Sequence, residues 1–441
     1  MSNKPYKIGM ISLGCPKNQV DAEQMLGTLS ASGFAITSDQ AEADVIVVNT
    51  CGFIRSAKEE AIEAILEAAK MKSKGACRAL IVAGCLAQRY QDELLEALPE
   101  ADAVIGTAGI GDIARICERV LSGQQHITEV SSPAMVFGLT RVSTTPRHYR
   151  YLKIAEGCSN RCSYCAIPII RGNFQSRPKD SIIEEATGLV DEGARELVLL
   201  AQDSTGYRDG DTDLSSLIKS LTKIEGIEWI RLMYAYPGRI SDSLMALMAE
   251  EEKVCAYLDI PVQHIDTKIL KAMNRRGSAD DIKGTIERLR RQVPGIALRT
   301  SLITGFPGET EAAFKRLLSF VKEAAFEHLG VFTYSPEEGT PASGLSPRVP
   351  DEVAQDRLDR IMKAQAKISL IKNRAMIGSV RAVLVDGMED MALYGRLETQ
   401  APEIDGVVYL SETDAEPGEF IDVTITDAGE YDLVGSLRNE K

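Results

Sequence analysis

The feature that most constrains the fold of this chain is the alternation of short apolar runs with longer helical patterns. In the first region, apolar runs at 7–13, 44–49 and 78–83 are separated by helical patterns such as 56–71 and 91–98. Strands that alternate with helices at a spacing of about 30 residues or more indicate βαβ units and a parallel sheet. The first region therefore predicts a doubly wound α/β domain.

A second region repeats this pattern six times and ends in a long helix. Most of its strand-like runs precede a helical stretch of about 15 residues or more, as in (β/α) barrels. Six such units predict an open (β/α)6 barrel, and the charged amphipathic pattern at 351–376 predicts a helix leading out of it. The six strand-like runs lie at 151–155, 196–201, 229–235, 256–262, 297–303 and 329–334.

The last part of the chain has a different pattern and a strong negative charge. Short apolar runs at 379–385, 407–410, 420–426 and 431–434 are separated by Gly, Asp and Pro, which predicts a small all-β barrel. From residue 375 onward, four basic residues stand against fifteen acidic ones, a net charge of −11 out of −14 for the chain. The predicted C-terminal barrel is therefore an acidic module.

A Ser-, Thr- and Pro-containing stretch separates the first two regions. Between 121 and 145 the alternation of strands and helices is lost, which is typical of a connection. We therefore expect an N-terminal α/β domain at 5–121, a linker at 122–143, a partial barrel at 144–374 and the acidic β-barrel at 375–441.

Cysteine is unusually frequent for a chain that we expect in the cytoplasm. No stretch approaches the roughly 18 apolar residues of a membrane helix, and the N-terminus lacks the apolar region of a signal peptide. The chain has nine Cys against four His. Disulfides are rare in a reducing compartment, so the thiols indicate another use.

Three of these residues form the C-x3-C-x2-C run Cys158, Cys162 and Cys165. A loop this short can wrap three thiolates around an iron–sulfur cluster and leave one iron free. Zinc is the alternative, but a structural zinc site needs a fourth Cys or His, and His148 upstream is a poor candidate. The run follows the first predicted barrel strand, at the carboxyl end where barrel active sites lie.

The run, with Tyr164 before its last cysteine, resembles the signature of the radical S-adenosylmethionine (radical SAM) superfamily. The resemblance implies a 4Fe–4S cluster whose free iron binds the amino and carboxylate groups of SAM. An electron from the cluster would cleave the sulfonium to give a 5′-deoxyadenosyl radical. It also implies an electron donor such as flavodoxin or ferredoxin, and places Tyr164 near SAM.

A second set of cysteines is dispersed in the N-terminal region. Cys15, Cys51 and Cys85 each follow the carboxyl end of a predicted strand. In a parallel sheet these ends meet at one edge, where open α/β folds bind ligands. A single cysteine is more often a small core residue than a ligand, but three with the same placement favour a shared site. We expect a structural role for the three without this placement, Cys77, Cys117 and Cys255.

Two three-cysteine sets in this order, followed by a small β domain, resemble the methylthiotransferases over nearly the whole chain. The resemblance implies that Cys15, Cys51 and Cys85 hold a second 4Fe–4S cluster, where sulfur or a methylthio group binds before transfer. It implies that SAM supplies both the radical and the methyl group, and that the small β domain is similar to a TRAM domain.

Residues at other predicted strand ends can also reach the carboxyl face of the barrel and contact SAM. Each one alone is equally well explained as a strand-end cap or turn residue. The Gly-Phe-Pro-Gly-Glu segment at 305–309 resembles a superfamily segment near the adenine, whereas a phosphate loop is excluded because no Gly-Lys-Ser or Gly-Lys-Thr is present. Besides Tyr164, the candidates are Gln202, Asp203, Arg231, Gln263, Gly305 and Glu309.

The methylthiotransferases have one branch that modifies adenosine in transfer RNA and one that modifies an aspartate of a ribosomal protein. Segments 12–18, 145–149 and 401–406 resemble the ribosomal-protein branch; Pro16 and Lys17 stand where the transfer-RNA branch typically has Gln and Met. A barrel that grips RNA needs Lys and Arg, so the acidic module would repel RNA and attract a basic ribosomal protein. Alternatively, its charge serves only solubility.

Together these features predict a radical SAM methylthiotransferase that inserts sulfur and a methyl group at the β-carbon of an aspartate of ribosomal protein S12. The partner would be free S12 or the small ribosomal subunit, with no membrane and no nucleic acid as direct substrate. One alternative is a transfer-RNA adenosine methylthiotransferase. Another is a non-catalytic iron–sulfur protein that docks on ribosomes and would not cleave SAM on reduction.

Overall fold

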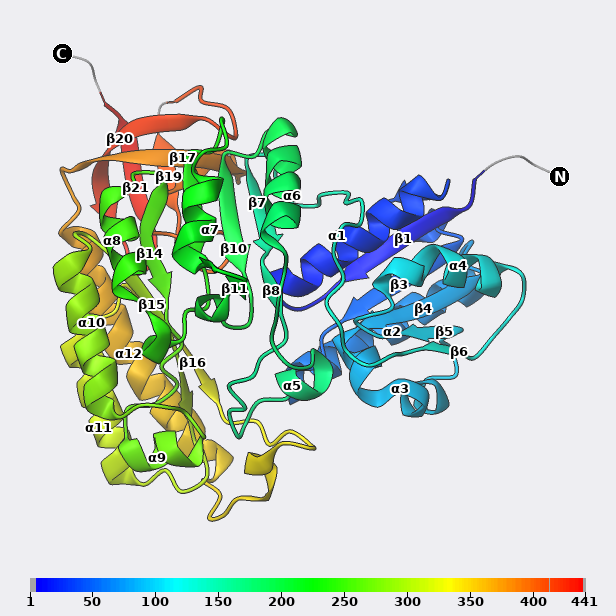
Figure 1. The fold of residues 1–441 in the computed structure, drawn as a ribbon, viewed down its shortest axis with the longest axis horizontal. Coiled ribbons are helices and arrows are strands. Elements are labelled where there is room, and N and C mark those ends of the chain that lie inside the picture. The colour runs from blue at the N-terminus through cyan, green and yellow to red at the C-terminus, as the bar shows by residue number, and fades with distance from the viewer. Residues whose placement is uncertain (1–4, 412, 439–441) are drawn as a thin grey trace.

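The computed structural model describes residues 5–411 and 413–438, which form an N-terminal, a central and a C-terminal domain (Figure 1). In Figure 1 the N-terminal domain is blue to cyan, the central domain green to yellow and the C-terminal domain orange to red, beyond the helix α12. In the described ranges, no helix is long and apolar enough to cross a membrane.

The N-terminal domain is built on six parallel strands in the order β2-β1-β3-β4-β5-β6. The order reverses between β1 and β3, and such a reversal is where open α/β sheets bind ligands. The strands are β1 (Lys7–Ser12), β2 (Ala35–Thr37), β3 (Val45–Thr50), β4 (Ala79–Gly84), β5 (Ala103–Ile105) and β6 (Ile127–Glu129); the helices are α1 (Pro16–Ala31), η1 (Gln40–Glu42), α2 (Arg55–Lys74), α3 (Cys85–Ala97), η2 (Ile110–Asp112) and α4 (Ile113–Leu121).

Both faces of this sheet are covered by helices. Along β3, Val47 packs in a core with Met25 of α1, whereas Val48 packs in a second core with Ile65 of α2. Strands buried on both faces are continuously apolar because neither face meets water. The predicted doubly wound domain is confirmed.

The sheet extends further along the chain than we predicted. Strand β6 (Ile127–Glu129) pairs with β5 inside the stretch expected to be a linker. The connection without helix or strand is therefore shorter, at 130–148. The strand is only three residues long, which is too short for an apolar pattern to mark it in the sequence.

The central domain has six parallel strands in the order β16-β15-β14-β13-β10-β7, so each main strand pairs with the next one along the chain. This confirms the open (β/α)6 barrel. The main strands are β7 (Tyr149–Lys153), β10 (Glu196–Leu200), β13 (Trp229–Leu232), β14 (Val254–Asp259), β15 (Ala297–Thr304) and β16 (His328–Thr333).

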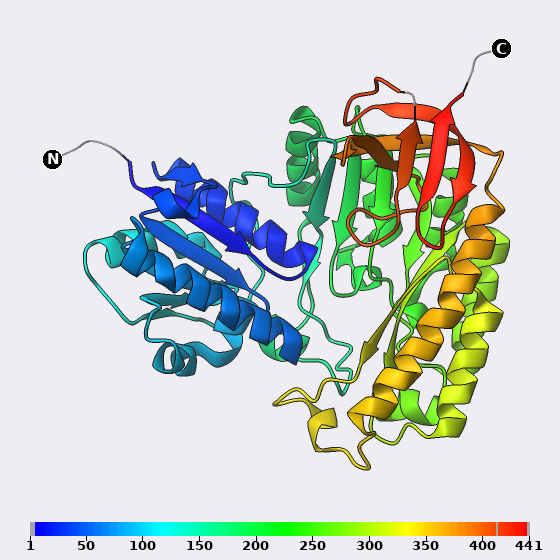
Figure 2. The same ribbon diagram turned by 180° about the vertical axis from the view of Figure 1, so that it is seen from behind.

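Helices and short strands complete the barrel. The helix α12 runs along β16 and α11 (Figure 2), as the amphipathic pattern at 351–376 predicts. These elements are β8 (Ala155–Glu156), α5 (Ile167–Ile170), β9 (Gln175–Ser176), α6 (Lys179–Asp191), η3 (Ser204–Gly206), β11 (Arg208–Asp209), β12 (Thr212–Asp213), α7 (Leu214–Leu221), η4 (Pro237–Arg239), α8 (Asp242–Glu250), α9 (Thr267–Ala272), α10 (Ala279–Gln292), α11 (Glu311–Ala324), η5 (Pro341–Gly344) and α12 (Asp351–Arg374).

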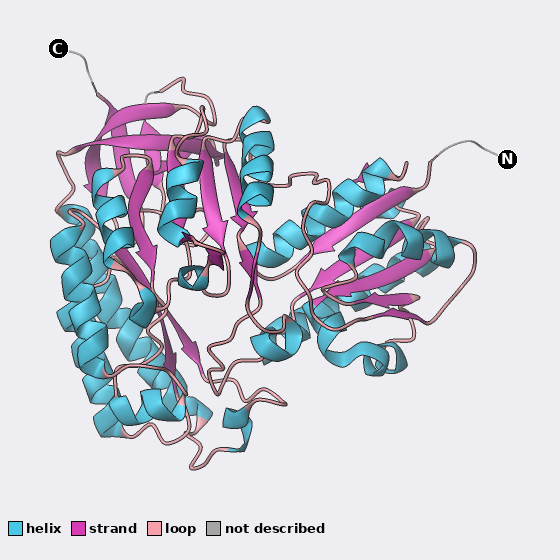
Figure 3. Ribbon diagram, in the orientation of Figure 1, coloured by secondary structure: helices cyan, strands magenta, loops and turns pink. Residues whose placement is uncertain are grey.

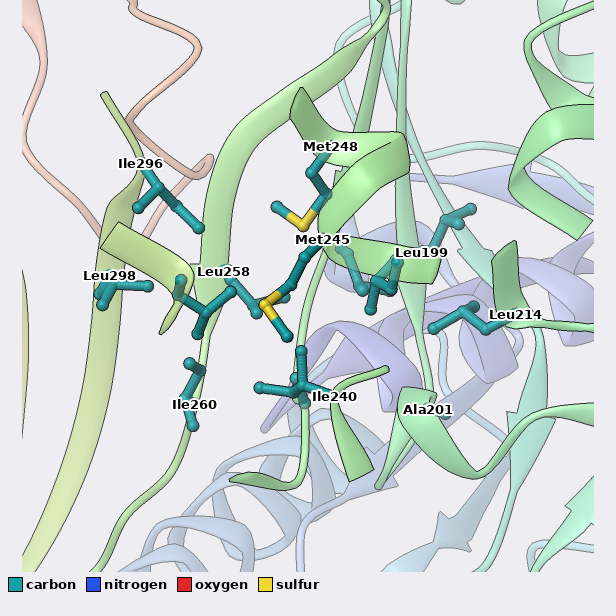
Figure 4. Packing of buried hydrophobic residues seen from close by; sticks show 14 of the residues in the cluster. Leu199, Ala201, Leu214, Ile240, Met245, Met248, Leu258, Ile260, Ile296 and Leu298 are labelled. Atoms are coloured by element: carbon teal, nitrogen blue, oxygen red, sulfur yellow. The ribbon is translucent and has the colours of Figure 1, made fainter. Parts of the chain in front are cut away.

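The main core lies between the barrel strands and their helices. Figure 4 shows Met245 and Met248 of α8 packed beside Leu258 of β14. Each such buried side chain contributes about 1.5–3 kcal/mol relative to exposure. This continuous core fixes the strands, and therefore fixes the loops at their carboxyl ends.

The C-terminal domain is a closed barrel with the strand order β17-β18-β19-β21-β20 (Figure 3). The predicted small all-β barrel is confirmed, although β18 was not among the predicted strands. Its first three residues are only half-buried and are followed by Gly395, so its apolar pattern is weak. The strands are β17 (Val380–Glu389), β18 (Ala392–Arg396), β19 (Val408–Ser411), β20 (Phe420–Ala428) and β21 (Leu433–Leu437).

This small barrel covers the amino ends of the central strands. Trp229, the first residue of β13, meets the ring of Phe420 edge-on with 4.8 Å between centroids. Arg396 lies 2.7 Å from Glu196, the first residue of β10. The carboxyl ends of the barrel strands are thereby left to face the N-terminal domain.

Part of the acidic charge of the C-terminal domain is used inside the molecule. Asp386 accepts hydrogen bonds from Arg396 and contacts His148 at 2.9 Å, and Asp405 accepts one from Arg299 at 2.8 Å. These carboxylates neutralise cations at the domain interface and cannot attract a partner. The acidic residues that remain exposed include Asp414, Glu416, Glu419, Asp422, Asp427 and Glu430.

Candidate active site

Cys15, Cys51 and Cys85 lie at the carboxyl ends of three adjacent strands. Cys15 follows β1 and precedes α1, Cys51 follows β3 directly, and Cys85 follows β4 as the first residue of α3. Because β1, β3 and β4 are neighbours in register, the three thiols lie along one edge, and Cys15 and Cys51 flank the point where the strand order reverses.

Glycines hold these loops close together. Gly14 has φ +94°, and a Cβ there would lie 2.9 Å from the Cβ of Cys51. Gly84, before Cys85, has φ +92°, and its Cβ would lie 2.4 Å from Oδ1 of Asn49. Only glycine combines this left-handed conformation with so close an approach. Each loop therefore reaches the shared edge because its cysteine is preceded by glycine or packed against one.

Asn18, on the first turn of α1, joins the ends of the same strands. Its amide nitrogen donates to the carbonyl of Leu13 at 2.6 Å and lies within 3.4 Å of those of Asn49 and Thr50. The side chain of Asn49 donates back to the carbonyl of Asn18 at 2.7 Å. These bonds fix the start of α1, and with it Cys15, against the neighbouring loops.

Cys158, Cys162 and Cys165 lie on the loop between β8 and α5. Gly157, at φ +70°, leaves no room for a Cβ, which would lie 2.2 Å from the carbonyl oxygen of Asn173. The backbone N–H of Cys158 donates to Gly172 at 3.0 Å. The side chain of Arg275 approaches Sγ of Cys162 to 3.8 Å. The loop is thus folded tightly around its three thiols.

The chemistry of both sets fits iron–sulfur clusters. All six residues are free thiols, and burial raises the pKa of Cys85 and Cys165 to about 12. Such thiols keep their protons at neutral pH unless a bound metal displaces the protons. In the described ranges no three His, Cys, Asp or Glu side chains converge to hold a single metal ion. In an iron–sulfur cluster, each cysteine binds a different iron.

Arg171 connects the two sets of cysteines. Its Nη2 donates to Sγ of Cys85 at 3.1 Å and to Oδ1 of Asn18 at 3.2 Å. Its Nη1 donates to Oδ2 of Asp21 at 2.5 Å and to Oε2 of Glu156 at 3.1 Å. Glu156 lies two residues before Cys158, so one guanidinium spans from the N-terminal thiols to the start of the barrel loop.

The carboxylates around Arg171 form a buried ionic network with Lys153. Nζ of Lys153 donates to Asp21 at 2.5 Å and to Glu156 at 3.0 Å. Burial alone would raise the pKa of Glu156, but the charges of Lys153 and Arg171 hold it well below its usual range. Glu156 is therefore ionised at neutral pH, and the network fixes the N-terminal domain on the barrel.

Three of the predicted SAM-contacting residues are half-buried in segments that follow barrel strands. The amide nitrogen of Gln202 donates to Glu156 at 2.9 Å, while its oxygen is buried without a partner in the described ranges. Tyr164 is half-buried and receives a hydrogen bond from Arg275. Gln263 is half-buried at φ +70°. Asn160, not predicted, also has a buried unpartnered oxygen.

Two other candidates are already hydrogen-bonded to groups of this chain. Asp203 accepts hydrogen bonds from Asn160 at 2.8 Å and Arg239 at 2.6 Å. Glu309 accepts hydrogen bonds from the backbone of Gly305 at 2.6 Å and from Arg357 at 2.9 Å. Both carboxylates position loops at the carboxyl face, with their binding capacity largely used.

Gly305 and Arg231 are explained by packing. A Cβ on Gly305 would lie 2.4 Å from that of Ala354 on α12. Arg231 is fully buried, donates to Glu196 at 2.6 Å and to the carbonyl of Glu398 at 2.5 Å. It therefore lies at the interface with the C-terminal barrel. The structure places it there and not at the carboxyl face of the central barrel, where we expected it.

Several residues of the site carry little signal in the sequence. Arg171, Lys153 and Asp21 come from three separate elements and meet only in the folded chain. Asp259, the last residue of β14, is buried with one oxygen unpartnered in the described ranges. Lys17 lies two residues after Cys15; the sequence marked it only as a difference from the transfer-RNA branch, and the adjacency to Cys15 is the signal that could have indicated a place in the site.

Replacing Asp259 by Asn should change the pH dependence of stability. Burial raises the pKa of Asp259 to about 7, against the opposing charges of Arg299 and Lys17 and with a contribution from Asp405. The protonated carboxyl stabilises the fold below its ordinary pKa of 3.8, and this contribution is lost as pH rises through about 7. Relative to wild type, D259N should gain up to about 4 kcal/mol between pH 4 and 8.

Urea unfolding of both proteins over this pH range measures the difference in their free energies of unfolding. The titration of all other groups contributes equally to both proteins and cancels in that difference. Curves that run parallel from pH 4 to 8 would show that Asp259 titrates alike in the folded and unfolded states.

Comparison with known proteins divides the chain into three matched segments. Residues 7–106 match a family described as uncharacterized protein family UPF0004, residues 152–321 the radical SAM superfamily, and residues 377–437 the TRAM domain. The second match coincides with the barrel that carries the C-x3-C-x2-C loop, and the third with the closed β-barrel.

Full-length relatives are identical to this chain at about half of the aligned positions. Ribosomal protein uS12 methylthiotransferase RimO of Geobacter sulfurreducens is 50% identical and covers 99% of this chain and 100% of its own. The proteins of the same name from Trichlorobacter lovleyi and Acetivibrio thermocellus are 49% and 48% identical, with at least 98% of each chain covered.

Solved structures with low sequence identity share the fold. The radical SAM methyltransferase TsrM of Kitasatospora setae aligns with a TM-score of 0.58 at 14% identity, covering 77% of this chain and 74% of its own. The cobalamin-dependent radical SAM enzyme OxsB aligns with a TM-score of 0.53 at 12% identity, covering 82% and 56%. Both likenesses extend over more than three quarters of this chain and show a shared fold.

Proposed function

Because this chain belongs to the RimO family of ribosomal protein uS12 methylthiotransferases, we propose that it inserts a methylthio group at the β-carbon of an aspartate of uS12. It is a radical SAM methylthiotransferase. The observation that carries the proposal is that Arg171 joins Cys85 of the N-terminal cysteine set to Glu156, two residues before the cysteine run of the barrel loop. The three full-length relatives described above carry the uS12 name, which favours the ribosomal protein over transfer RNA as substrate.

The radical SAM superfamily implies one 4Fe–4S cluster and SAM, and we propose a second cluster in addition. Cys158, Cys162 and Cys165 would hold the first cluster at the barrel. The set Cys15, Cys51 and Cys85 would hold the second. When bound, the two clusters and SAM supply the radical that removes hydrogen from the target carbon and the sulfur and methyl groups of the product.

The residues of the chain position these groups and shield them from water. The free amide oxygens of Gln202 and Asn160 can accept hydrogen bonds from SAM. Arg171 carries positive charge beside Cys85, and Arg275 does the same beside Cys162. We propose that the reaction takes place in the cytoplasm, with electrons from a donor such as flavodoxin or ferredoxin.

The proposal is tested by weighing the product. Anaerobically reconstituted protein is mixed with SAM, a reductant and either purified uS12, 30S subunits or transfer RNA. Mass spectrometry should find methylthio in place of one hydrogen on an aspartate of uS12, and no such product in transfer RNA. SAM cleavage without any modified uS12 would overturn the substrate, and no SAM cleavage at all would favour the non-catalytic alternative.

The exposed acids of the C-terminal barrel give the proposed partner a docking surface. They remain exposed, whereas Asp386 and Asp405 at the interface with the central domain are paired with cations. A basic ribosomal protein would be drawn to this surface by long-range attraction, which acts mainly on association rate.

Replacing Asp414, Glu416 and Glu419 by Lys should therefore weaken binding of uS12. All three are exposed; Glu412 of the same acidic run lies outside the described residues. We expect about a tenfold loss of association rate at 0.01 M salt, where charges act over about 30 Å, and a smaller loss at 0.15 M. Stopped-flow measurement at several salt concentrations checks this.

A matched variant separates position from net charge. Glu59, Glu63 and Glu67 are exposed on α2 of the N-terminal domain, and their replacement by Lys changes the net charge of the chain equally. If the association rate of both variants falls by the same factor, the effect comes from total charge, and the C-terminal barrel is not the docking surface.

A further inference from the structure

Lys17 is a buried cation without a counter-ion. It is 8% exposed, and the other buried lysine of the described ranges, Lys153, is paired with two carboxylates. Within residues 5–411 and 413–438, no carboxylate lies within 4.0 Å of Nζ of Lys17; the ammonium instead lies 3.8 Å from the ring centroid of Tyr234. Burying a charge unpaired is costly, so this placement calls for an anionic ligand.

Lys17 lies beside Cys15 of the N-terminal set, where α1 meets the barrel. It follows Cys15 by two residues on the first turn of α1, and the start of α1 lies against the central domain in Figure 1. Tyr234 follows β13 by two residues, at the carboxyl end of the barrel. Val20, one turn further along α1, packs with Tyr151 and Tyr257 inside the barrel. The ammonium is therefore directed over the carboxyl ends of the strands.

The charged groups around Lys17 leave it available for a ligand. Glu156 is the nearest ionised carboxylate in the barrel loop, but Lys153, Arg171 and Gln202 already occupy it. Asp259 carries a buried oxygen without a partner in the described ranges. An unpaired cation and an unpaired acid oxygen at the same end of the barrel indicate a polar ligand that contacts both.

We propose that Lys17 binds the side-chain carboxylate of the target aspartate of uS12. This inference rests on the proposed function, which supplies a substrate whose reacting group carries a carboxylate. The β-carbon to be modified is bonded directly to that carboxylate. A hydrogen-bonded ion pair with Lys17 therefore holds the reacting carbon between the two cysteine sets, and it selects aspartate over asparagine because the amide has no charge.

A double-mutant cycle tests the contact by binding alone. The affinity of cluster-loaded, SAM-bound wild type and K17M is measured for uS12 and for uS12 with the target aspartate replaced by asparagine. The methionine keeps an unbranched side chain, one heavy atom shorter, and removes its charge. In wild type, the asparagine substitution should weaken binding about 10- to 100-fold, as expected for a charged hydrogen bond. In K17M it should change binding less than about threefold.

Further variants keep the test decisive. K17R retains the charge and should retain most of the preference for the aspartate form of uS12. The exposed residue Lys219 provides the matched control, and K219M should behave as wild type. Iron content and circular dichroism check the fold of each variant. If K17M does not fold, the wild-type arm still decides, since equal affinity for the aspartate and asparagine forms overturns the proposal.

The carboxylate of SAM is the competing ligand, and a separate arm distinguishes it. The affinity of wild type and K17M for SAM is measured without uS12. A loss confined to SAM, with the preference for aspartate intact, overturns the assignment to the target aspartate. Failure of wild type to modify uS12 would instead overturn the proposed function itself, which the product masses report independently of any Lys17 variant.

Discussion

Replacing Cys158, Cys162 and Cys165 together by Ala is expected to remove half of the iron and all SAM cleavage. Wild type should contain about eight iron and eight sulfide per chain after anaerobic reconstitution, and the triple variant about four of each. The remaining half belongs to the other cysteine set, which lies on a different domain. Methylthiolation of uS12 should fall below detection because no radical is formed. Iron and sulfide assays and chromatography of 5′-deoxyadenosine measure both effects.

Cys51→Ala is the matched variant on the other set. It should leave the barrel loop with its cluster and its reductive cleavage of SAM, and abolish methylthiolation, because the radical is made at the other site. Cys51 is half-buried beside Gly14, so alanine fits its place without strain.

Two outcomes would contradict this division of labour. If the barrel variant loses all its iron while its circular dichroism is unchanged, the two sites do not assemble independently. If folded Cys51→Ala loses SAM cleavage as well, the N-terminal set takes part in radical formation. Arg171, which contacts Cys85 and Glu156, is the route by which such dependence would be transmitted.

The cysteine sets could be predicted because their information is local. Each N-terminal cysteine directly follows an apolar run, and parallel topology converts that placement into proximity at one edge. The glycine before Cys15 and Cys85 adds to the signal, since its left-handed conformation serves the same close approach. The six main strands of the barrel were likewise visible as repeated apolar runs.

The ionic network could not be predicted, because it depends on tertiary contacts. Asp21 and Arg171 are 150 positions apart and meet only when α1 packs against the barrel loop. A lone Asp on a helix reads as a solvated residue in the sequence. Arg231 shows the reverse case: its strand position suggested a ligand contact, but the C-terminal barrel occupies it through Glu398, a contact that no local pattern encodes.

Replacing Arg171 by Met should be among the most damaging single changes outside the cysteines. The side chain is 3% exposed and donates to Asp21, Glu156, Asn18 and Cys85. Without it, two buried carboxylates share Lys153 alone, and breaking a buried ion pair in this way costs about 3–5 kcal/mol. Thermal unfolding under anaerobic conditions should show the loss, and hydrogen exchange should place it in α1 and the 156–173 segment.

A second substitution separates charge from geometry in this prediction. R171K keeps one positive charge, but an ammonium lacks the planar fork that reaches from Asp21 and Glu156 to Cys85, so it should recover stability only in part. Arg55→Met, at an exposed ion pair with Glu59, should leave the unfolding temperature unchanged. If R171M unfolds at the same temperature as wild type, the network contributes no net stability, because the cost of burying its charges equals the attraction between them. Its role would then be to fix the positions of the two cysteine sets relative to each other. The iron content and methylthiolation activity of R171M would reveal that role.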